Sequence, residues 1–129
     1  MVPIDMDFAW QTFKEPDPES ELRGVVGYLR PSGYRTVPRV LWHTRKIEAQ
    51  LSESAGLVGY ALRAKLAQKK FWAVAAWESD ESLQNFVESD PHAEIRVALK
   101  REMEESWFKR FDVNGEEIPL DIDGGLERV

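Results

Sequence analysis

The segment FWAVAAW, residues 71–77, constrains the fold most, because it is apolar on both of its faces. It is too short and too rich in aromatic and β-branched residues for a helix, and the polar residues 78–81 end it, so it predicts a strand. Because side chains alternate along a strand, its two faces are lined by Phe71, Ala73, Ala75 and Trp77, and by Trp72, Val74 and Ala76. A strand of this kind needs a layer of structure on both faces of its sheet.

Two helical regions are predicted around this strand. The first runs from Thr36 to about Ser54, with apolar residues at helical spacing and Gly56 as its stop. The second has two parts that are separated at Ser89-Asp90-Pro91, because proline suits the first position of a new helix and Asp90 can cap it. We expect its second part to continue to Glu104-Glu105.

Three further strands are predicted at residues 23–30, 57–66 and 106–113. The resulting order, β-α-β-β-α-β, is an α+β ferredoxin-like fold: a four-stranded antiparallel sheet with two helices on one face. The second face of the sheet is also apolar. We therefore expect two copies to pack their sheets face to face in a homodimeric α/β barrel.

The predicted domain covers residues 23–113, between an N-terminal aromatic and acidic extension at 1–22 and an acidic tail at 114–129. Phe8, Trp10 and Phe13 in the extension either cover an exposed edge or groove of the domain or of a partner, or form a lid over a pocket. Pro119 weakens the tail as an internal strand, so we expect it to form an extended edge or an arm over the neighbouring subunit.

Charge and composition bear on location and partners. The net charge is −6, and residues 23–111 have 15 basic against 11 acidic residues, with no concentrated Lys/Arg stripe of the kind that nucleic-acid binding needs. The sequence has no Cys, which excludes thiolate chemistry and is compatible with a reducing compartment. No signal-peptide pattern or membrane span is predicted. We therefore expect a cytoplasmic protein that binds neither nucleic acid nor membrane.

The run WESDESLQNFVESDPH, residues 77–92, combines a Trp that ends a strand, an acidic helix start and a His at the next helix start. In this pattern, over roughly Leu22 to Val113, the chain resembles the antibiotic biosynthesis monooxygenase family within the dimeric α/β-barrel group. The resemblance implies a ligand cavity inside each subunit, between the sheet and the helices. It also implies that Trp77 packs against a substrate and that His92 belongs to the site.

His92 also stands out from its position alone. A helix N-terminus disfavours a cation by about 0.3–1 kcal/mol, so a His there tends to be neutral near pH 7 and able to accept a proton. The alternative is a core or capping His with no chemistry. His43 has a weaker case, because nothing in the first helix orients it, and a surface role is its alternative.

Other residues are candidates for substrate binding. Ala73 and Ala75 beside Trp77 either leave a hollow or admit a closely packed helix. Phe86 is expected on the inner face of the following helix, and Tyr28 could orient a substrate. No set of side chains suggests a metal site, a phosphate loop or a nucleophile elbow.

Two functions follow from these observations. The first is a cofactor-independent monooxygenase acting on a hydrophobic or aromatic small molecule, with Trp77 and His92 as its catalytic residues. Oxygenases and heme degraders of this group commonly use an Asn near the first strand, and residues 24–33 contain none. The second function is therefore a non-catalytic or heme-binding protein that holds a hydrophobic ligand, with His92 as the axial ligand if heme is bound.

Overall fold

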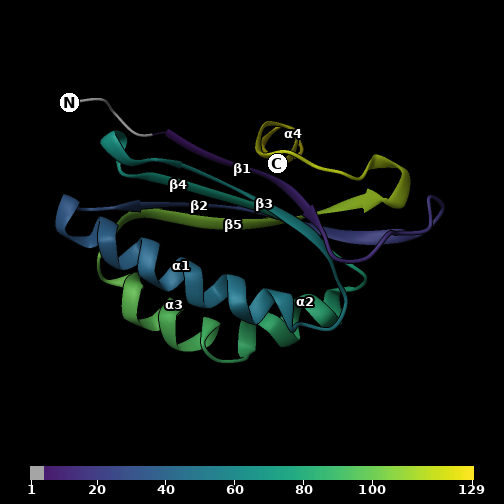
Figure 1. Ribbon diagram of the computed structural model, residues 1–129, viewed down its shortest axis with the longest axis horizontal. Helices are drawn as coiled ribbons and strands as arrows, with labels where there is room; N and C mark the ends of the chain where they lie inside the picture. Colours follow the sequence, from purple (N-terminus) through teal and green to yellow (C-terminus); the bar gives the residue numbers. More distant parts are fainter. Residues whose placement is uncertain (1–4) are drawn as a thin grey trace.

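A computed structural model describes residues 5–129, which form one antiparallel sheet with helices on both faces (Figure 1). The strand order is β1-β3-β4-β2-β5. The strands are β1 (Asp5–Thr12), β2 (Glu21–Pro31), β3 (Leu57–Lys65), β4 (Lys70–Trp77) and β5 (Met103–Asn114). The helices are α1 (Val37–Ser52), α2 (Asp80–Glu88), α3 (His92–Lys100) and α4 (Ile122–Glu127), and short 3₁₀ turns lie at Tyr34–Thr36, Leu66–Gln68 and Gly115–Glu117.

The ferredoxin-like order is confirmed, because β2, α1, β3, β4, the pair α2 and α3, and β5 follow one another as predicted. The prediction of four strands is wrong. Residues 5–12, which we expected to lie outside the domain, form β1 and pair with β3. Met6 of β1 packs on the helix side of the sheet and Trp10 on the other side, because the register shifts between Phe8 and Gln11 and interrupts the alternation of side chains. Residues 1–4 of the predicted extension lie outside the described residues.

The prediction that α3 continues to Glu104-Glu105 is also wrong. The helix ends at Lys100, and β5 begins at Met103, where it pairs with Pro31 at the end of β2. The ladder between β2 and β5 then extends to the pair of Glu21 with Asn114. Glu104 and Glu105 lie in a strand because β2 is long enough to pair with a β5 that begins before them, at Met103.

The C-terminal tail does not form the extended arm that we expected. It turns at Gly115–Glu117 and places α4 on the face of the sheet opposite the other helices (Figure 1). Asp121 caps α4 by accepting a hydrogen bond from the backbone N–H of Gly124 at 2.6 Å. Ile122 is 2% exposed in a cluster with Val26 and Val74 of the central strands. The chain therefore covers part of its own second sheet face.

Both faces of the sheet are apolar, as the sequence of β4 predicts. The face toward α1, α2 and α3 carries two buried clusters, one around Trp77 and one around Phe71. The opposite face carries a third cluster, which includes Val74 and Ala76.

Candidate functional site

One row of side chains on the helix face of the sheet is incompletely covered. The strand register places Leu62, Ala73, Gly27 and Phe108 side by side across β3, β4, β2 and β5. Leu62 and Ala73 remain partly accessible although their strands lie inside the sheet, and Phe108 is 59% exposed. The helices therefore leave accessible apolar surface along this row.

This row lies between the residues on which α2 packs and those on which α3 packs. Leu83 and Phe86 of α2 pack with Ala75 and Val25, which form the adjacent row on the side toward Trp77. On the other side, α3 packs on Phe71. Ile47 of α1 packs against both of the clusters that flank the row.

Helix α3 packs, together with α1, on the part of this face around Phe71. Ile95 and Leu99 belong to one cluster with Phe71, and Leu29 packs against it. His92 is the first residue of α3, so it lies at the end of the helix that adjoins the junction with α2.

Three of the predicted site residues form a continuous run of tilted ring contacts, the aromatic stack, at this end of the molecule. The ring centroids of Trp77 and Phe86 are 5.1 Å apart, and those of Phe86 and His92 are 4.8 Å apart. Ala75 belongs to the same buried cluster as Trp77 and Phe86. The structure thus brings together Trp77, Phe86, Ala75 and His92, with Ala73 in the adjoining row.

Trp77 is fully buried, yet its indole Nε1 has no hydrogen-bond partner among residues 5–129. Buried polar groups are nearly always paired, and an unpaired one calls for an explanation such as a bound water or ligand. Phe86 packs on the Trp77 ring, and Trp77 does not contact solvent directly.

His92 is half-buried, and its Nδ1 lies 3.1 Å from the carbonyl oxygen of Val87. A carbonyl only accepts hydrogen bonds, so Nδ1 carries the proton and Nε2 is the nitrogen that can take another. Burial lowers the pKa of His92; the bond to Val87 opposes this shift, and the charge of Arg96 adds to it. The neutral imidazole is therefore favoured, with a free base at Nε2.

The other two candidates lie elsewhere. Tyr28 is on the opposite face of the sheet, between Trp72 and Trp107, with ring centroids at 5.4 and 5.9 Å. Its burial raises the pKa of its hydroxyl. His43 lies on α1; burial lowers its pKa, and the charges of Lys46 and Arg39 add to this shift. Neither residue joins the stack of Trp77, Phe86 and His92.

An open groove of about 500 Å³ lies beside the stack, between the end of α1 and the start of α2. Phe86 is its large apolar residue. The other residues that line it are mainly polar or acidic: Gln50, Glu53, Ser54, Ala55, Gly56, Glu78, Ser79, Glu81, Ser82, Asn85, Ser89 and Asp90. A hydrophobic ligand fits the row at Ala73 and Phe108 better than this groove.

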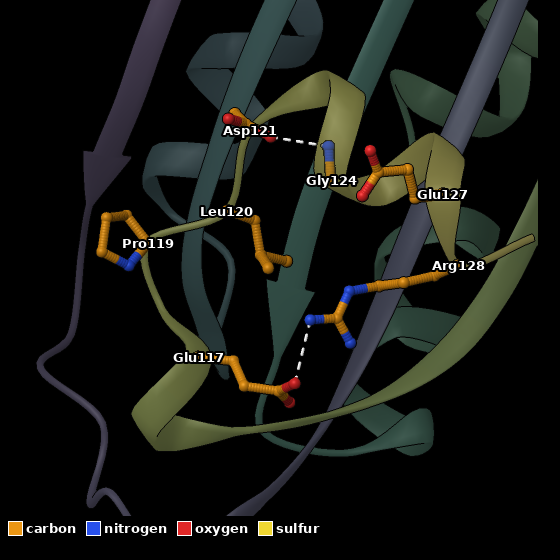
Figure 2. A pocket seen from close by; sticks show the side chains of 7 residues that line it. All are labelled: Glu117, Pro119, Leu120, Asp121, Gly124, Glu127 and Arg128. Atoms are coloured by element: carbon orange, nitrogen blue, oxygen red, sulfur yellow. Dashed lines mark hydrogen bonds and ion pairs between the residues drawn. The ribbon is translucent and has the colours of Figure 1, made fainter.

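A second hollow, of about 420 Å³, lies at α4 on the opposite face of the sheet (Figure 2). Figure 2 shows Arg128 reaching Glu117, which it contacts at 2.9 Å. This hollow contains none of the predicted site residues. Its polar contacts hold the C-terminal tail together.

Residues 5–129 contain neither a candidate membrane-spanning helix nor a candidate metal-binding cluster. No helix in this range is long and apolar enough to cross a membrane. Within the same range, His, Asp and Glu do not gather in a group of three that could hold a metal ion.

The structure is similar to several solved proteins. A putative monooxygenase from Fusobacterium nucleatum matches with a TM-score of 0.68 at 10% identity, over 84% of this chain and 48% of the other. A putative antibiotic biosynthesis monooxygenase from Nitrosomonas europaea matches with a TM-score of 0.63 at 13% identity, over 75% and 92%. SnoaB, a cofactor-independent oxygenase from Streptomyces nogalater, matches with a TM-score of 0.53 at 14% identity, over 71% and 91%.

This chain shares their ferredoxin-like fold. No protein-family model matches the sequence, and no curated protein matches it. The chain spans about half the length of the Fusobacterium protein, so the likeness to that protein covers only part of it. The ferredoxin-like fold expected from the resemblance at residues 77–92 is confirmed.

Three residues of the site were not predicted from the sequence. Gly27 could have been suspected, because a glycine inside a strand often marks a close approach; an added Cβ there would lie 2.3 Å from the Phe108 ring. Phe108 lies in the strand predicted at residues 106–113, but the sequence did not indicate which face of the sheet it would line. Gln50 gave no signal, because a glutamine on a helix is usually a surface residue.

Proposed function

We propose that this chain is a cofactor-independent oxygenase of the antibiotic biosynthesis type, acting on a hydrophobic or aromatic small molecule. The observation that carries the proposal is the pairing of two features: accessible apolar surface along the row of Ala73, Gly27 and Phe108, and His92 at the start of α3, whose Nδ1 faces the Val87 carbonyl and leaves Nε2 free. The shared fold with proteins named as monooxygenases supports it.

The row suits a flat apolar ligand. Ala73 and Gly27 have little or no side chain, and Phe108 offers an aromatic ring that is 59% exposed. Offset stacking on such a ring contributes about 0.5–1.5 kcal/mol beyond the burial of area. An aromatic substrate would bury this surface and displace water from it.

His92 acts as the general base in this proposal. Its Nε2 takes a proton from an acidic C–H or O–H group of the substrate, and the resulting anion reacts with O2. For a CH2 group between two aromatic rings, one oxygen atom forms a carbonyl, and the other leaves as water with the two hydrogens. The Nδ1–H bond to Val87 keeps Nε2 available for this step.

The test uses anthrone, a tricyclic ketone whose CH2 group is acidic, and follows oxygen uptake and quinone formation. His92→Ala is compared with His43→Ala, which removes the other histidine of the sequence from a site outside the stack. We expect His92→Ala to lower the rate by about 100-fold, as loss of a general base does, and His43→Ala to leave it unchanged. Equal rates in wild type and both variants would refute the role of His92.

Heme binding is the second candidate, and one observation favours it. A histidine that ligates a metal almost always donates its other ring N–H to a carbonyl or carboxylate, and His92 donates Nδ1–H to Val87. His92 Nε2 would hold the iron, and a bound heme would supply one-electron and oxygen chemistry. A hemin titration should then give a Soret shift in wild type and His43→Ala but not in His92→Ala.

We also propose that the protein forms a homodimer through the second sheet face. Helix α4 covers this face at Val26 and Val74, and beyond it Trp72 and Trp107 remain partly accessible on either side of Tyr28. This strip of three aromatic rings is an apolar surface that a second copy can bury.

The remaining parts of the proposal concern partners and location. The net charge of −6 favours a small-molecule ligand over nucleic acid or an anionic membrane surface. A cytoplasmic location is compatible with a sequence that lacks cysteine.

A further inference from the structure

The side chain of Gln50, on α1, bonds to the junction between α2 and α3 at three points. Its Nε2 donates to the carbonyl oxygens of Phe86 and Ser89, each at 3.2 Å. Its Oε1 accepts from the backbone N–H of His92 at 2.9 Å. One side chain thus connects the end of α2, the loop and the start of α3.

These partners determine which way the amide group points. Two carbonyl oxygens can only face the NH2 group of Gln50, and a backbone N–H can only face its oxygen. The opposite orientation would place the amide oxygen against two carbonyls and leave the N–H of His92 facing an NH2 group. The three contacts therefore agree on one orientation of Gln50.

The same bonds determine where the His92 ring lies. The ring bonds to the carbonyl of Val87, five residues earlier in the chain, so this contact needs the end of α2 and the start of α3 to keep their relative positions. Gln50 holds the residue next to Val87 through the Phe86 carbonyl, and it holds His92 through its N–H. Without Gln50, the bond of the His92 ring to Val87 and the bond from the Ala93 N–H to the Ser89 carbonyl would remain, but α1 would no longer hold the two helix ends together.

We propose that Gln50 is a positioning residue that keeps His92 in the Nδ1–H tautomer, with Nε2 unprotonated and free to act as a base. The catalytic meaning of this tautomer rests on the proposed function, but the tautomer itself can be measured without any substrate. An imidazole with no fixed partner favours the other tautomer, with the proton on Nε2. Gln50 therefore selects the nitrogen that His92 presents.

The experiment is a ¹⁵N-edited NMR spectrum of the imidazole rings at a pH where both are neutral. The sequence contains two histidines, so His43 is an internal reference in every spectrum. The test variant is Gln50→Met, which keeps the length of the side chain and removes its hydrogen bonds. Gln84→Met is the matched control, because Gln84 bonds only to exposed Glu88 and Arg110.

In wild type and Gln84→Met we expect His92 as the Nδ1–H tautomer. In Gln50→Met we expect most of the signal to shift to the Nε2–H tautomer, with His43 unchanged. If Gln50→Met does not fold, Gln50→Glu is used, since it keeps the acceptor for the His92 N–H and replaces the donor to Phe86 and Ser89 by an oxygen. Wild-type tautomer populations in whichever of the two variants folds would overturn the proposal.

This outcome is separate from that of the proposed function. A tautomer shift in Gln50→Met together with full oxygenation by His92→Ala supports the role of Gln50 and refutes the function. Conversely, an unchanged tautomer in Gln50→Met together with loss of oxygenation in His92→Ala overturns the role of Gln50 and leaves the function supported.

Discussion

The ring of Phe108 on β5 lies directly over the backbone of Gly27 on β2. A Cβ added to Gly27 would lie 2.3 Å from two carbons of this ring. Phe108 is 59% exposed, so its ring has room to move away. The same strand has a second such contact at Gly24, where an added Cβ would lie 2.2 Å from the ring of Phe111, which is 7% exposed.

This difference predicts a clear order of stability among three Gly→Ala variants. Gly24→Ala should lower the free energy of unfolding by about 1–3 kcal/mol, because the buried Phe111 has nowhere to move and the core is overpacked. Gly27→Ala should stay within about 1 kcal/mol of wild type, because the displaced Phe108 ring enters solvent and alanine suits a strand better than glycine.

Gly33→Ala is the matched control, since no atom lies within 4 Å of its added Cβ, and its effect should be within about 0.5 kcal/mol. Urea unfolding followed by far-UV circular dichroism measures all three variants. Equal losses in Gly24→Ala and Gly27→Ala would contradict the different freedom assigned to the two rings.

The lowered pKa of His92 predicts a pH dependence of stability. Burial is the main cause of the shift, and an unfolded chain has a pKa near the usual 6.5. Below that value the unfolded state therefore binds more protons than the folded state, so stability rises with pH through this range and is complete above it. The free energy of unfolding should fall as the pH is lowered from 7 toward 5.

Replacing His92 by Asn should reduce this slope, and the urea midpoints of wild type and variant measured across the same pH range provide the test. His43→Asn separates the contribution of the second histidine, whose pKa is also lowered by burial. Asp123 and Glu117 have lowered pKa values too, so their contributions to the free energy of unfolding are lost only at more acidic pH. A slope in His92→Asn as steep as that of wild type would show that His92 is not the group responsible.

Helix α4 should contribute substantially to stability although it is short. Ile122 is 2% exposed in the cluster with Val26 and Val74, so Ile122→Ala should lower the free energy of unfolding by about 2–5 kcal/mol. Val129→Ala is the control, because Val129 is 44% exposed and should have little effect. Thermal unfolding of both variants tests this, and equal midpoints would mean that α4 is not docked on the sheet.

The parts of the fold that follow local rules could be predicted from the sequence. The two apolar faces of residues 71–77, the break at Pro91 and the position of His92 at a helix start all follow from side-chain alternation and from the chemistry of proline. The stack of Trp77, Phe86 and His92 joins a strand end to the helices that follow it directly in the chain, so its members were named from one short stretch.

The parts that depend on distant partners could not be predicted. Residues 5–12 form a strand because the edge of β3 is free to pair, and their alternation of polar and apolar residues does not identify that distant partner. The glycines at 124 and 125 argue against a helix, yet Gly125 allows α4 to approach Val74, with an added Cβ at only 3.0 Å. Gln50 acquires its role only when α1 meets the junction 36 to 42 residues later.

The partly accessible aromatic strip on the second sheet face predicts that Trp72→Glu separates the proposed homodimer into monomers. A glutamate there would bring an unpaired charge into an interface of aromatic rings, and burying such a charge is strongly unfavourable. Trp42→Glu is the matched control, because Trp42 lies 61% exposed on α1, on the other side of the molecule. Light scattering after size-exclusion chromatography should give a dimer for wild type and Trp42→Glu and a monomer for Trp72→Glu. A dimer that persists in Trp72→Glu but is lost in Trp42→Glu would assign the interface to the helix side.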